Sequence, residues 1–275
     1  MAKKVVFKYM KITPKRAEDW LEKSDLLNRP VNDPWIKDLT DEIKRGNWRG
    51  DNAETIKLDE NQSIVDGQHR LWAIFYSEMS VWATVAFNVD PAVFPTIDVG
   101  QRRTGAHTLA VASFKNSNVL SSAAKYYSRF KDVGLKKMLH GPAKIKANNR
   151  VILATVKAYP ELVESVGFIK SFKNVRGIHN GKIAFLHCLF AQKHSDKANT
   201  FVEKLYTGED LGKGSPILAL RTKLFAISVL KDMVNNHSKD LFFMVIVIKA
   251  WNAFREGKTK KVLGWGSTET APKIK

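Results

Sequence analysis

The sequence predicts an α+β protein, with a domain that mixes helices and strands over residues 1–112 and an all-α basic domain over residues 113–275. Apolar residues follow both helical and strand spacing before residue 112, and almost only helical spacing after it. Residues 1–112 carry 16 Lys and Arg against 16 Asp and Glu, whereas residues 113–275 carry 29 against 11. The polar stretch 115–118 lies close to the boundary that these differences predict.

The first expected element is a helix from Pro14 to about Lys23, with Thr13 as N-cap and proline at the first helical position. A second helix is expected over residues 35–44, ending before Gly46. The rest of the domain is expected to contain strands over residues 55–58, 63–65 and 80–88 and helices over residues 68–78 and 104–112.

The second domain is expected to consist of helices separated by glycine and proline. The helical period predicts them over residues 119–130, 148–159, 182–193, 197–206, 217–235 and 239–255. The longest apolar run, residues 241–248, is far shorter than the ~18 residues that cross a bilayer. We therefore expect a buried helix there, followed by a loose polar tail from Gly257.

The composition is that of a globular protein, with 44% hydrophobic and 26% charged residues. A single cysteine, Cys188, excludes an internal disulfide framework, and its apolar surroundings in the sequence place it in the core. No signal-peptide pattern follows Met1, so we expect a cytoplasmic protein without a membrane partner. The formal charge of +18 favours a polyanionic partner, with nucleic acid first.

The most informative segment is Asp66-Gly67-Gln68-His69-Arg70, which follows a predicted strand and opens a predicted helix. This geometry directs the first backbone N–H groups of the helix and the positive end of its dipole at one point. An anion is stabilised there, because Gly67 lets a phosphate approach the backbone and His69 and Arg70 add donors. The alternative interpretation is structural, with Asp66 as a helix cap and Arg70 solvated.

A second segment has the same character, because an acidic residue, a glycine and two arginines precede a predicted helix. Two helix starts suited to anions in one small domain favour phosphate binding, although an arginine pair alone is typical of a protein surface. The residues expected to contribute here are Asp98, Gln101, Arg102, Arg103 and Thr104.

Residues 66–73 resemble the DGQHR signature of the ParB/sulfiredoxin superfamily. Residues 28–30, 46–48 and 97–104 resemble ParB-like proteins of phages and mobile elements, so the resemblance covers about residues 5–112. It implies a small mixed-sheet domain that binds a nucleoside triphosphate, CTP or ATP with Mg²⁺, because partition proteins of this type bind CTP and DNA and sulfiredoxins use ATP. By resemblance, the phosphates would be held by Gly67, Gln68, His69 and Arg70.

Differences from the motifs of the family reduce the number of activities that we expect. Gln68 stands where sulfiredoxins carry their nucleophilic cysteine, so repair of an oxidised cysteine is not expected. No helix-turn-helix pattern follows the first domain, which argues against centromere-type DNA reading. Asp66 and Asp98 are the only carboxylates of the two motifs and are therefore the candidate catalytic residues of an enzyme.

Basic clusters of the second domain are the candidate nucleic-acid contacts, since lysines on loops can follow a phosphate backbone. Binding through them should be steeply salt-dependent. The histidines near Cys188 fit no standard zinc spacing, and the aromatic residues of this domain are expected in its core. The basic residues concerned are Lys136, Lys137, Lys144, Lys146, Arg150, Lys258, Lys260 and Lys261.

These observations predict a nucleotide-responsive DNA-binding protein, a regulator or DNA-processing factor of a phage or mobile element. DNA is favoured over RNA, and a homodimer is among the expected partners. Two alternatives stay open: an enzyme that uses the Asp66–Arg70 segment as an NTPase, phosphotransferase or nuclease, and a non-enzymatic protein that binds a host protein.

Overall fold

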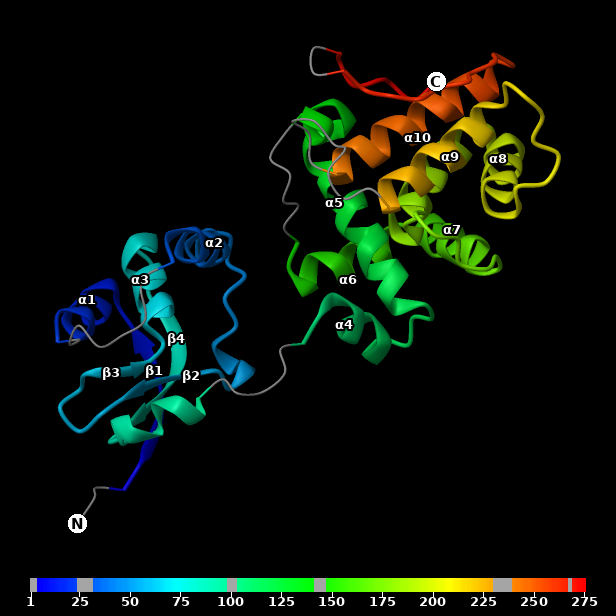
Figure 1. Cartoon of the computed structure of the whole chain (residues 1–275). Coiled ribbons are helices and arrows are strands. Elements are labelled where there is room, and N and C mark those ends of the chain that lie inside the picture. The colour runs from blue at the N-terminus through cyan, green and yellow to red at the C-terminus, as the bar shows by residue number, and fades with distance from the viewer. Residues whose placement is uncertain (1–3, 24–31, 98–102, 141–146, 230–238, 267–268) are drawn as a thin grey trace. The chain divides into compact units, whose positions relative to one another are not determined.

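The structure is a computed structural model that describes residues 4–23, 32–97, 103–140, 147–229, 239–266 and 269–275 (Figure 1). It divides into two compact units, residues 1–101 and 102–275, called here the N-terminal unit and the helical unit. The expected α+β class is confirmed, since a mixed sheet lies in the first unit and helices dominate the chain. The N-terminal unit carries 14 Lys and Arg against 16 Asp and Glu, and the helical unit carries 31 against 11.

The division lies before the boundary near residue 112 that the charge distribution predicts. The reason is the packing of α4 (Gly105–Val111), which contacts α5 (Ser117–His140) and α6 (Asn149–Ala158). Leu109 of α4 is fully buried in the core of the helical unit. The difference in formal charge between the two units is therefore larger than the difference between residues 1–112 and residues 113–275.

The N-terminal unit contains a four-stranded mixed sheet with the order β1-β4-β2-β3. Strand β4 pairs antiparallel with β1 and parallel with β2, and β2 pairs antiparallel with β3. Three strands lie within one residue of their predicted ranges, whereas the edge strand β1 was not predicted. The strands are β1 (Val6–Ile12), β2 (Thr55–Leu58), β3 (Ile64–Asp66) and β4 (Val81–Phe87).

Three helices cover one face of this sheet: α1 (Pro14–Glu22), α2 (Asp33–Lys44) and α3 (Gln68–Ser77) (Figure 1). Their apolar side chains share a core with strand residues that alternate onto the same face. Thr13 Oγ1 caps α1 by accepting a hydrogen bond from the Arg16 N–H, as the sequence predicts. Asn32 caps α2, which begins two residues before its predicted start.

The helices of the second unit extend beyond several predicted ends. Helix α5 continues past the non-helical Gly134, and α8 (Asn180–Thr207) joins two predicted helices across His194. Helix α7 (Pro160–Lys170) was not predicted, because Pro160 reads as a helix end but occupies the first position of a new helix. The remaining helices are α9 (Pro216–Val229) and α10 (Lys239–Arg255).

The core of the helical unit forms around α10. All residues of its apolar run, Leu241 to Ile248, are buried, as expected for this segment. Cys188 lies in the same core, and burial raises the pKa of its thiol to about 12, which leaves it protonated and unreactive. Among the described residues, no helix is long and apolar enough to cross a membrane.

The segment after α10 is not loose, contrary to the sequence expectation. The Trp251 indole N–H donates to the Lys275 carbonyl oxygen at 3.3 Å, and the Asn252 side-chain amide donates to the Lys273 carbonyl oxygen at 2.8 Å. The side chains of Leu263 and Trp265 are buried. Side chains of α10 thus satisfy the backbone of this segment and hold it against the helix.

His187 is buried and neutral in the helical unit. Its Nε2 lies 3.0 Å from Asn199 Oδ1 and its Nδ1 lies 3.1 Å from Ser165 Oγ. An amide oxygen only accepts hydrogen bonds, so Nε2 carries the proton and Nδ1 accepts from the Ser165 hydroxyl. Burial lowers the pKa of His187 below its ordinary value of 6.5.

This histidine makes stability depend on pH. Below pH 6.5 the unfolded chain binds a proton at His187 that the folded chain does not. The free energy of unfolding should therefore decrease as the pH is lowered, by at most about 1.4 kcal/mol per pH unit. We expect urea unfolding at pH 7.5, 6.5 and 5.5 to show this loss. His187→Gln, which keeps an amide at the site, should reduce the slope, and an unchanged slope would contradict the assignment.

Candidate phosphate and nucleic-acid sites

The predicted strand–turn–helix segment is present. Strand β3 ends at Asp66, Gly67 adopts φ 104°, and α3 begins at Gln68. A side chain at Gly67 would be strained by this φ, and its Cβ would lie 3.1 Å from the side chain of Ile56. Glycine is therefore required to turn the chain from the strand directly into the helix.

The start of α3 has no side-chain cap. By contrast, α1, α2, α4 and α6 each begin with a side chain that accepts a hydrogen bond from the first turn. The first N–H groups of a helix have no partner within the helix. His69 is engaged elsewhere, because its Nε2 accepts a hydrogen bond from the backbone N–H of Asn32 at 3.2 Å. The first turn of α3 thus presents backbone donors without a capping oxygen.

Arg70 lies in the first turn of α3 beside two other charged side chains. Asp66 Oδ2 accepts hydrogen bonds from Lys57 Nζ at 2.7 Å and from Arg70 Nη2 at 3.4 Å. Asp66 is only 9% exposed and the Arg70 side chain 20%. The three groups together carry one surplus positive charge in a mostly buried setting, and sequence analysis did not identify Lys57.

One nitrogen of Arg70 is not satisfied by these contacts. Its Nη1 is buried and has no hydrogen-bond partner among the described residues. Nη1 forms only a long ion pair with Glu54: the Oε2 atom lies 3.9 Å away, and the Glu54 side chain is 71% exposed. An unsatisfied guanidinium nitrogen beside an uncapped helix start is suited to a phosphate oxygen.

Asp66 is already paired with two cations, which orient and neutralise its carboxylate. No group of three His, Cys, Asp or Glu side chains that could hold a metal ion is found in the described ranges. Asp98, the other candidate catalytic carboxylate, lies outside the described residues. Asp66 thus holds Lys57 and Arg70 through ion pairs, and a catalytic role for Asp66 or Asp98 stays a prediction.

The second motif is described only in part, since Gln101 and Arg102 also lie outside the described residues. Thr104 caps α4: its Oγ1 accepts from the His107 N–H at 3.3 Å, and His107 Nδ1 accepts from the Thr104 N–H at 3.4 Å. The Arg103 carbonyl oxygen accepts a hydrogen bond from the Asn149 side chain. Thr104 and Arg103 belong to the helical unit, and a phosphate role for them stays a prediction.

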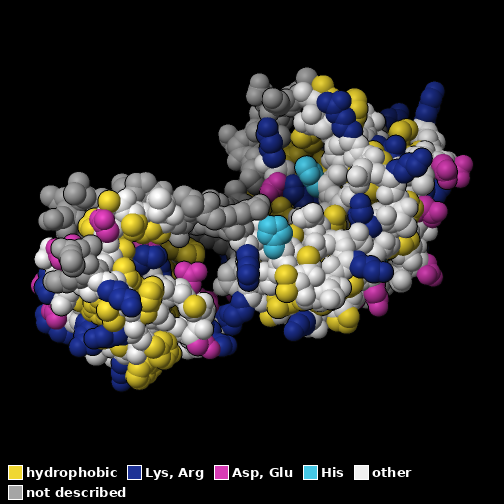
Figure 2. Space-filling model, turned by 90° about the horizontal axis from the view of Figure 1, so that it is seen from below, with side chains coloured by type: hydrophobic (Ala, Val, Ile, Leu, Met, Phe, Trp, Pro, Cys, Tyr) yellow, Lys and Arg dark blue, Asp and Glu magenta, His cyan; other side chains and the backbone are white. Residues whose placement is uncertain are grey.

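The predicted nucleic-acid contacts of the helical unit lie on separate elements. Lys136 and Lys137 are exposed on the part of α5 that follows Gly134, and Arg150 is exposed in the first turn of α6. Lys144 and Lys146 fall outside the described residues. Figure 2 shows many Lys and Arg side chains scattered over the visible face of this unit.

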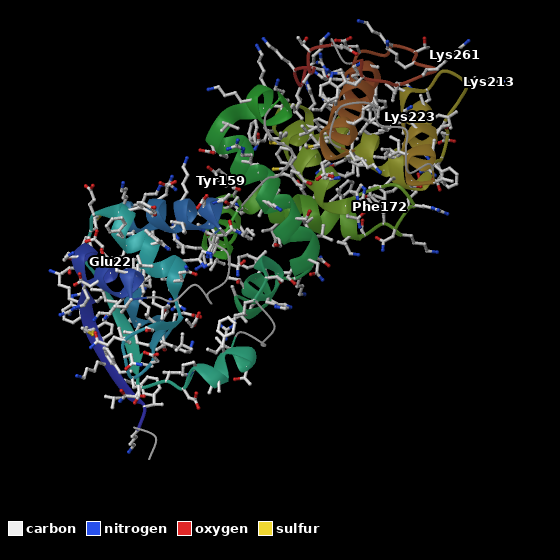
Figure 3. All side chains as sticks on the ribbon, turned by 60° about the vertical axis from the view of Figure 1, so that its left-hand side comes forward. Glu22, Tyr159, Phe172, Lys213, Lys223 and Lys261 are labelled. Atoms are coloured by element: carbon white, nitrogen blue, oxygen red, sulfur yellow. The ribbon has the colours of Figure 1, made fainter. Side chains whose placement is uncertain are left out.

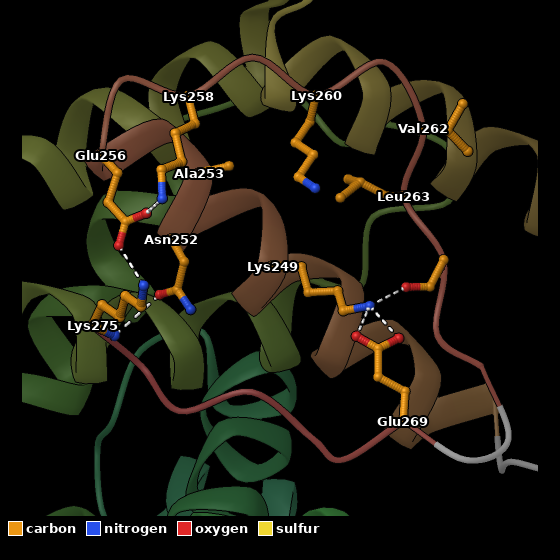
Figure 4. A pocket seen from close by; sticks show the side chains of 11 residues that line it. Lys249, Asn252, Ala253, Glu256, Lys258, Lys260, Val262, Leu263, Glu269 and Lys275 are labelled. Carbon is orange, nitrogen blue, oxygen red and sulfur yellow. Dashed lines mark hydrogen bonds and ion pairs between the residues drawn. The ribbon is translucent and has the colours of Figure 1, made fainter.

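The predicted tail lysines converge with two residues that sequence analysis missed. Side chains from α10 and from the segment after it line a cavity of about 300 Å³ (Figure 4). Lys258, Lys260, Lys249 and Lys275 contribute four positive charges to its wall, and Glu256 and Glu269 contribute two negative ones. Lys249 and Lys275 lie at opposite ends of this part of the chain, so no local pattern could have joined them.

Both glutamates of this cavity are held by lysines. Hydrogen bonds from Lys258, at 2.8 Å, and from Lys275, at 2.6 Å, lower the pKa of Glu256 to about 2. The hydrogen bond from Lys249 lowers the pKa of Glu269. Lys260 differs from these lysines, since among the described residues its ammonium group forms no hydrogen bond or ion pair (Figure 4).

Lys213 extends this basic surface from the segment between α8 and α9. The backbone N–H of Lys260 donates to the Gly214 carbonyl oxygen at 2.8 Å, which brings exposed Lys213 next to the segment that carries Lys261 (Figure 3). The C-terminal lysine cluster is defined here as Lys213, Lys249, Lys258, Lys260, Lys261 and Lys275.

Comparisons of the chain with protein-family models, with curated proteins and with solved structures find no match.

Proposed function

We propose that the protein is a ParB-like, nucleotide-responsive DNA-binding protein that serves a phage or mobile element as a regulator or DNA-processing factor. A nucleoside triphosphate, CTP or ATP with Mg²⁺, would bind at the start of α3, and DNA would bind to the helical unit. The observation that carries the proposal is the uncapped first turn of α3 beside the unsatisfied Nη1 of Arg70.

The phosphate part of the proposal rests on three complementary donors. The backbone N–H groups of the first turn and the helix dipole favour an anion there. Arg70 supplies a guanidinium that Asp66 holds in place, and Lys57 keeps the local charge positive. Gly67 turns the chain directly from β3 into α3 and carries no side chain that could cap the helix.

The DNA part rests on the charge of the helical unit, whose 31 Lys and Arg against 11 Asp and Glu give a formal charge of +20. Within it, the C-terminal lysine cluster places six lysines on neighbouring segments. Such a surface binds phosphate backbones without reading sequence. We therefore propose contacts with the DNA backbone as the main source of affinity.

The nucleotide site is tested by Arg70→Ala. We expect CTP or ATP to bind about 10- to 100-fold more weakly in calorimetry, because the variant cannot form a charge-assisted hydrogen bond to phosphate. Asp66 keeps Lys57 as a partner, so the variant should fold. Arg45→Ala is the matched control, since Arg45 is exposed at the end of α2 and pairs only loosely with Glu42, at 3.9 Å. Failure of the wild type to bind either nucleotide would refute the site.

The DNA site is tested by the triple variant Lys213→Ala, Lys260→Ala and Lys261→Ala. We expect weaker binding to a 20-base-pair duplex and a salt dependence whose slope falls by about 0.9 for each phosphate that the variant no longer neutralises. A control removes the same charge from exposed lysines at the end of α1 and on α2 (Lys23→Ala, Lys37→Ala and Lys44→Ala). Arg70→Ala should keep the basal DNA affinity but lose its response to nucleotide; equal effects of the two triple variants would count against the lysine cluster.

A further inference from the structure

The sheet of the N-terminal unit has one face that α1, α2 and α3 leave uncovered, and only a small cluster formed by Val65, Ala86 and Val89 is buried there. Helices α1, α2 and α3 all pack on the face that carries Ile12, Val81 and Val85. The opposite face of β1 and β4 carries large aromatic side chains that are exposed: Phe7 is 65% exposed, Tyr9 56% and Trp82 51%. Burial of apolar area is the main stabilising contribution in folding, so three exposed aromatic rings on one sheet face require an explanation.

The strand register arranges these side chains in rows across the sheet. Tyr9 pairs with Thr84, which pairs with Thr55 of β2. Phe7 lies in the row that continues through Ala86 and Lys57 to Asp66, and Lys11 lies directly opposite Trp82. The rings of Tyr9 and Trp82 are stacked with centroids 5.3 Å apart and planes inclined by 23°. The Tyr9 and Trp82 rings therefore form one flat surface, with threonine and lysine residues paired in the same rows.

The backbone under this surface is fixed in place. The Trp48 indole N–H donates to the Trp82 carbonyl oxygen at 2.8 Å. Gly50 approaches the same carbonyl so closely that a Cβ would lie 1.9 Å from its oxygen, and 3.3 Å from the Tyr9 hydroxyl. A side chain at residue 50 would push Trp82 and Tyr9 aside. The two rings are thus supported from the edge of the sheet rather than left free.

We propose that this exposed sheet face, formed by Phe7, Tyr9, Lys11, Thr55, Trp82 and Thr84, is a base-stacking site for single-stranded nucleic acid. Unpaired bases stack on aromatic rings at little cost in sequence preference, while neighbouring cations contact the phosphates.

The charge of this sheet face favours single-stranded nucleic acid over an apolar protein surface as its partner. Lys11 lies opposite Trp82 at one end of the face, and at the other end Lys57 is neutralised by Asp66, its neighbour in the same row. Arg16 of α1 lies beside the Lys11 end, because its Nη1 donates to the carbonyl oxygen of Lys11 at 3.4 Å. Figure 2 shows basic and hydrophobic side chains interleaved on the visible face of this unit. An interface with an apolar partner would leave the cationic groups of Lys11 and Arg16 desolvated.

The test is made on the full chain with a 12-nucleotide oligo-dT that carries 5-iodouracil. Binding is measured by fluorescence anisotropy at about 0.3 M NaCl, where contacts made by charge alone are weakened and stacking persists. Irradiation then links the oligonucleotide to the residues that it touches, and mass spectrometry identifies them. We expect adducts on the peptides that contain β1 or β4.

The double variant Tyr9→Ala and Trp82→Ala should bind at least about tenfold more weakly and lose these adducts. Tyr9→Phe with Trp82→Phe should retain binding, since the rings remain. The matched control is Tyr76→Ala with Trp35→Ala, because those side chains are 53% and 50% exposed on α3 and α2.

Three results would overturn the proposal. One is equal binding by the double variant and the matched control. Another is the restriction of all adducts to residues 102–275. The third is a wild-type dimer in sedimentation that the double variant lacks, with no adducts, which would assign the face to a second copy of the chain. The stacking site depends on Tyr9 and Trp82 rather than on Arg70, Lys57 or the C-terminal lysine cluster, so its failure would leave the proposed function intact, and the reverse also holds.

Discussion

Trp251→Ala is expected to lower the free energy of unfolding of the helical unit by about 3–5 kcal/mol. The side chain of Trp251 is completely buried, and its ring stacks on that of Phe190 with centroids 4.5 Å apart. The ring also meets Phe201 edge to face, and its N–H donates to the Lys275 carbonyl oxygen. Alanine removes these interactions and leaves a cavity that the surrounding helices can fill only in part.

The measurement is urea unfolding followed by circular dichroism at 222 nm, which reports mainly on helices. Trp35→Ala serves as the control, since half of that side chain is exposed, and should change the free energy of unfolding by no more than about 0.5 kcal/mol. A Trp251→Ala variant as stable as the control would contradict the packing described for α10. Trp251→Ala also removes the hydrogen bond to the Lys275 carbonyl oxygen, and it should therefore weaken DNA binding by the C-terminal lysine cluster.

Asp240→Ala is expected to cost about 3 kcal/mol, because it leaves the ammonium group of a buried lysine without its partner. Lys182 is 8% exposed, and its Nζ lies 2.6 Å from Asp240 Oδ1 and 5.0 Å from the centre of the Phe243 ring. Tyr126 donates to the other carboxylate oxygen at 3.1 Å. Burial acts to raise the pKa of Asp240, but the hydrogen bonds and charge of Lys182 and Tyr126 outweigh it and the pKa is lowered.

Lys182→Met provides the comparison, since it removes the buried charge and keeps the volume of the side chain. Asp240 is 47% exposed and remains hydrated, so this variant should cost less than Asp240→Ala. The double variant should cost less than the sum of the two, because each single change leaves one charge unpaired. A larger destabilisation by Lys182→Met than by Asp240→Ala would show that the pair is not the origin of the effect.

Elements with strong local signals were predicted well. The N-cap of α1 at Thr13, the start of α3 after Gly67 and the bounds of α10 all agree with the sequence prediction. Strand β1 was missed because apolar residues occupy both of its faces, and alternation shows only when one face is polar. The ordering of the segment after α10 depends on single hydrogen bonds from distant residues, which no periodicity reveals.

The candidate phosphate site was likewise predictable only where its residues are neighbours in the sequence. Gly67, His69 and Arg70 follow one another in the sequence, so their common place at the helix start could be read from the motif. Lys57 enters the site through the pairing of β2 with β3, and its distance to Asp66 depends on a register that includes an irregularity. Lys213, Lys249 and Lys275 join the C-terminal lysine cluster through tertiary packing alone.

The pairing of Arg70 with Asp66 has a consequence for how a ligand would be exchanged. The carboxylate of Asp66 contacts Nη2 of Arg70 in the free protein and leaves Nη1 without a partner among the described residues. A phosphate at Nη1 would therefore add a second anionic partner to Arg70 without displacing Asp66. The guanidinium would stay in position before and after release, so binding would cost little ordering of this side chain.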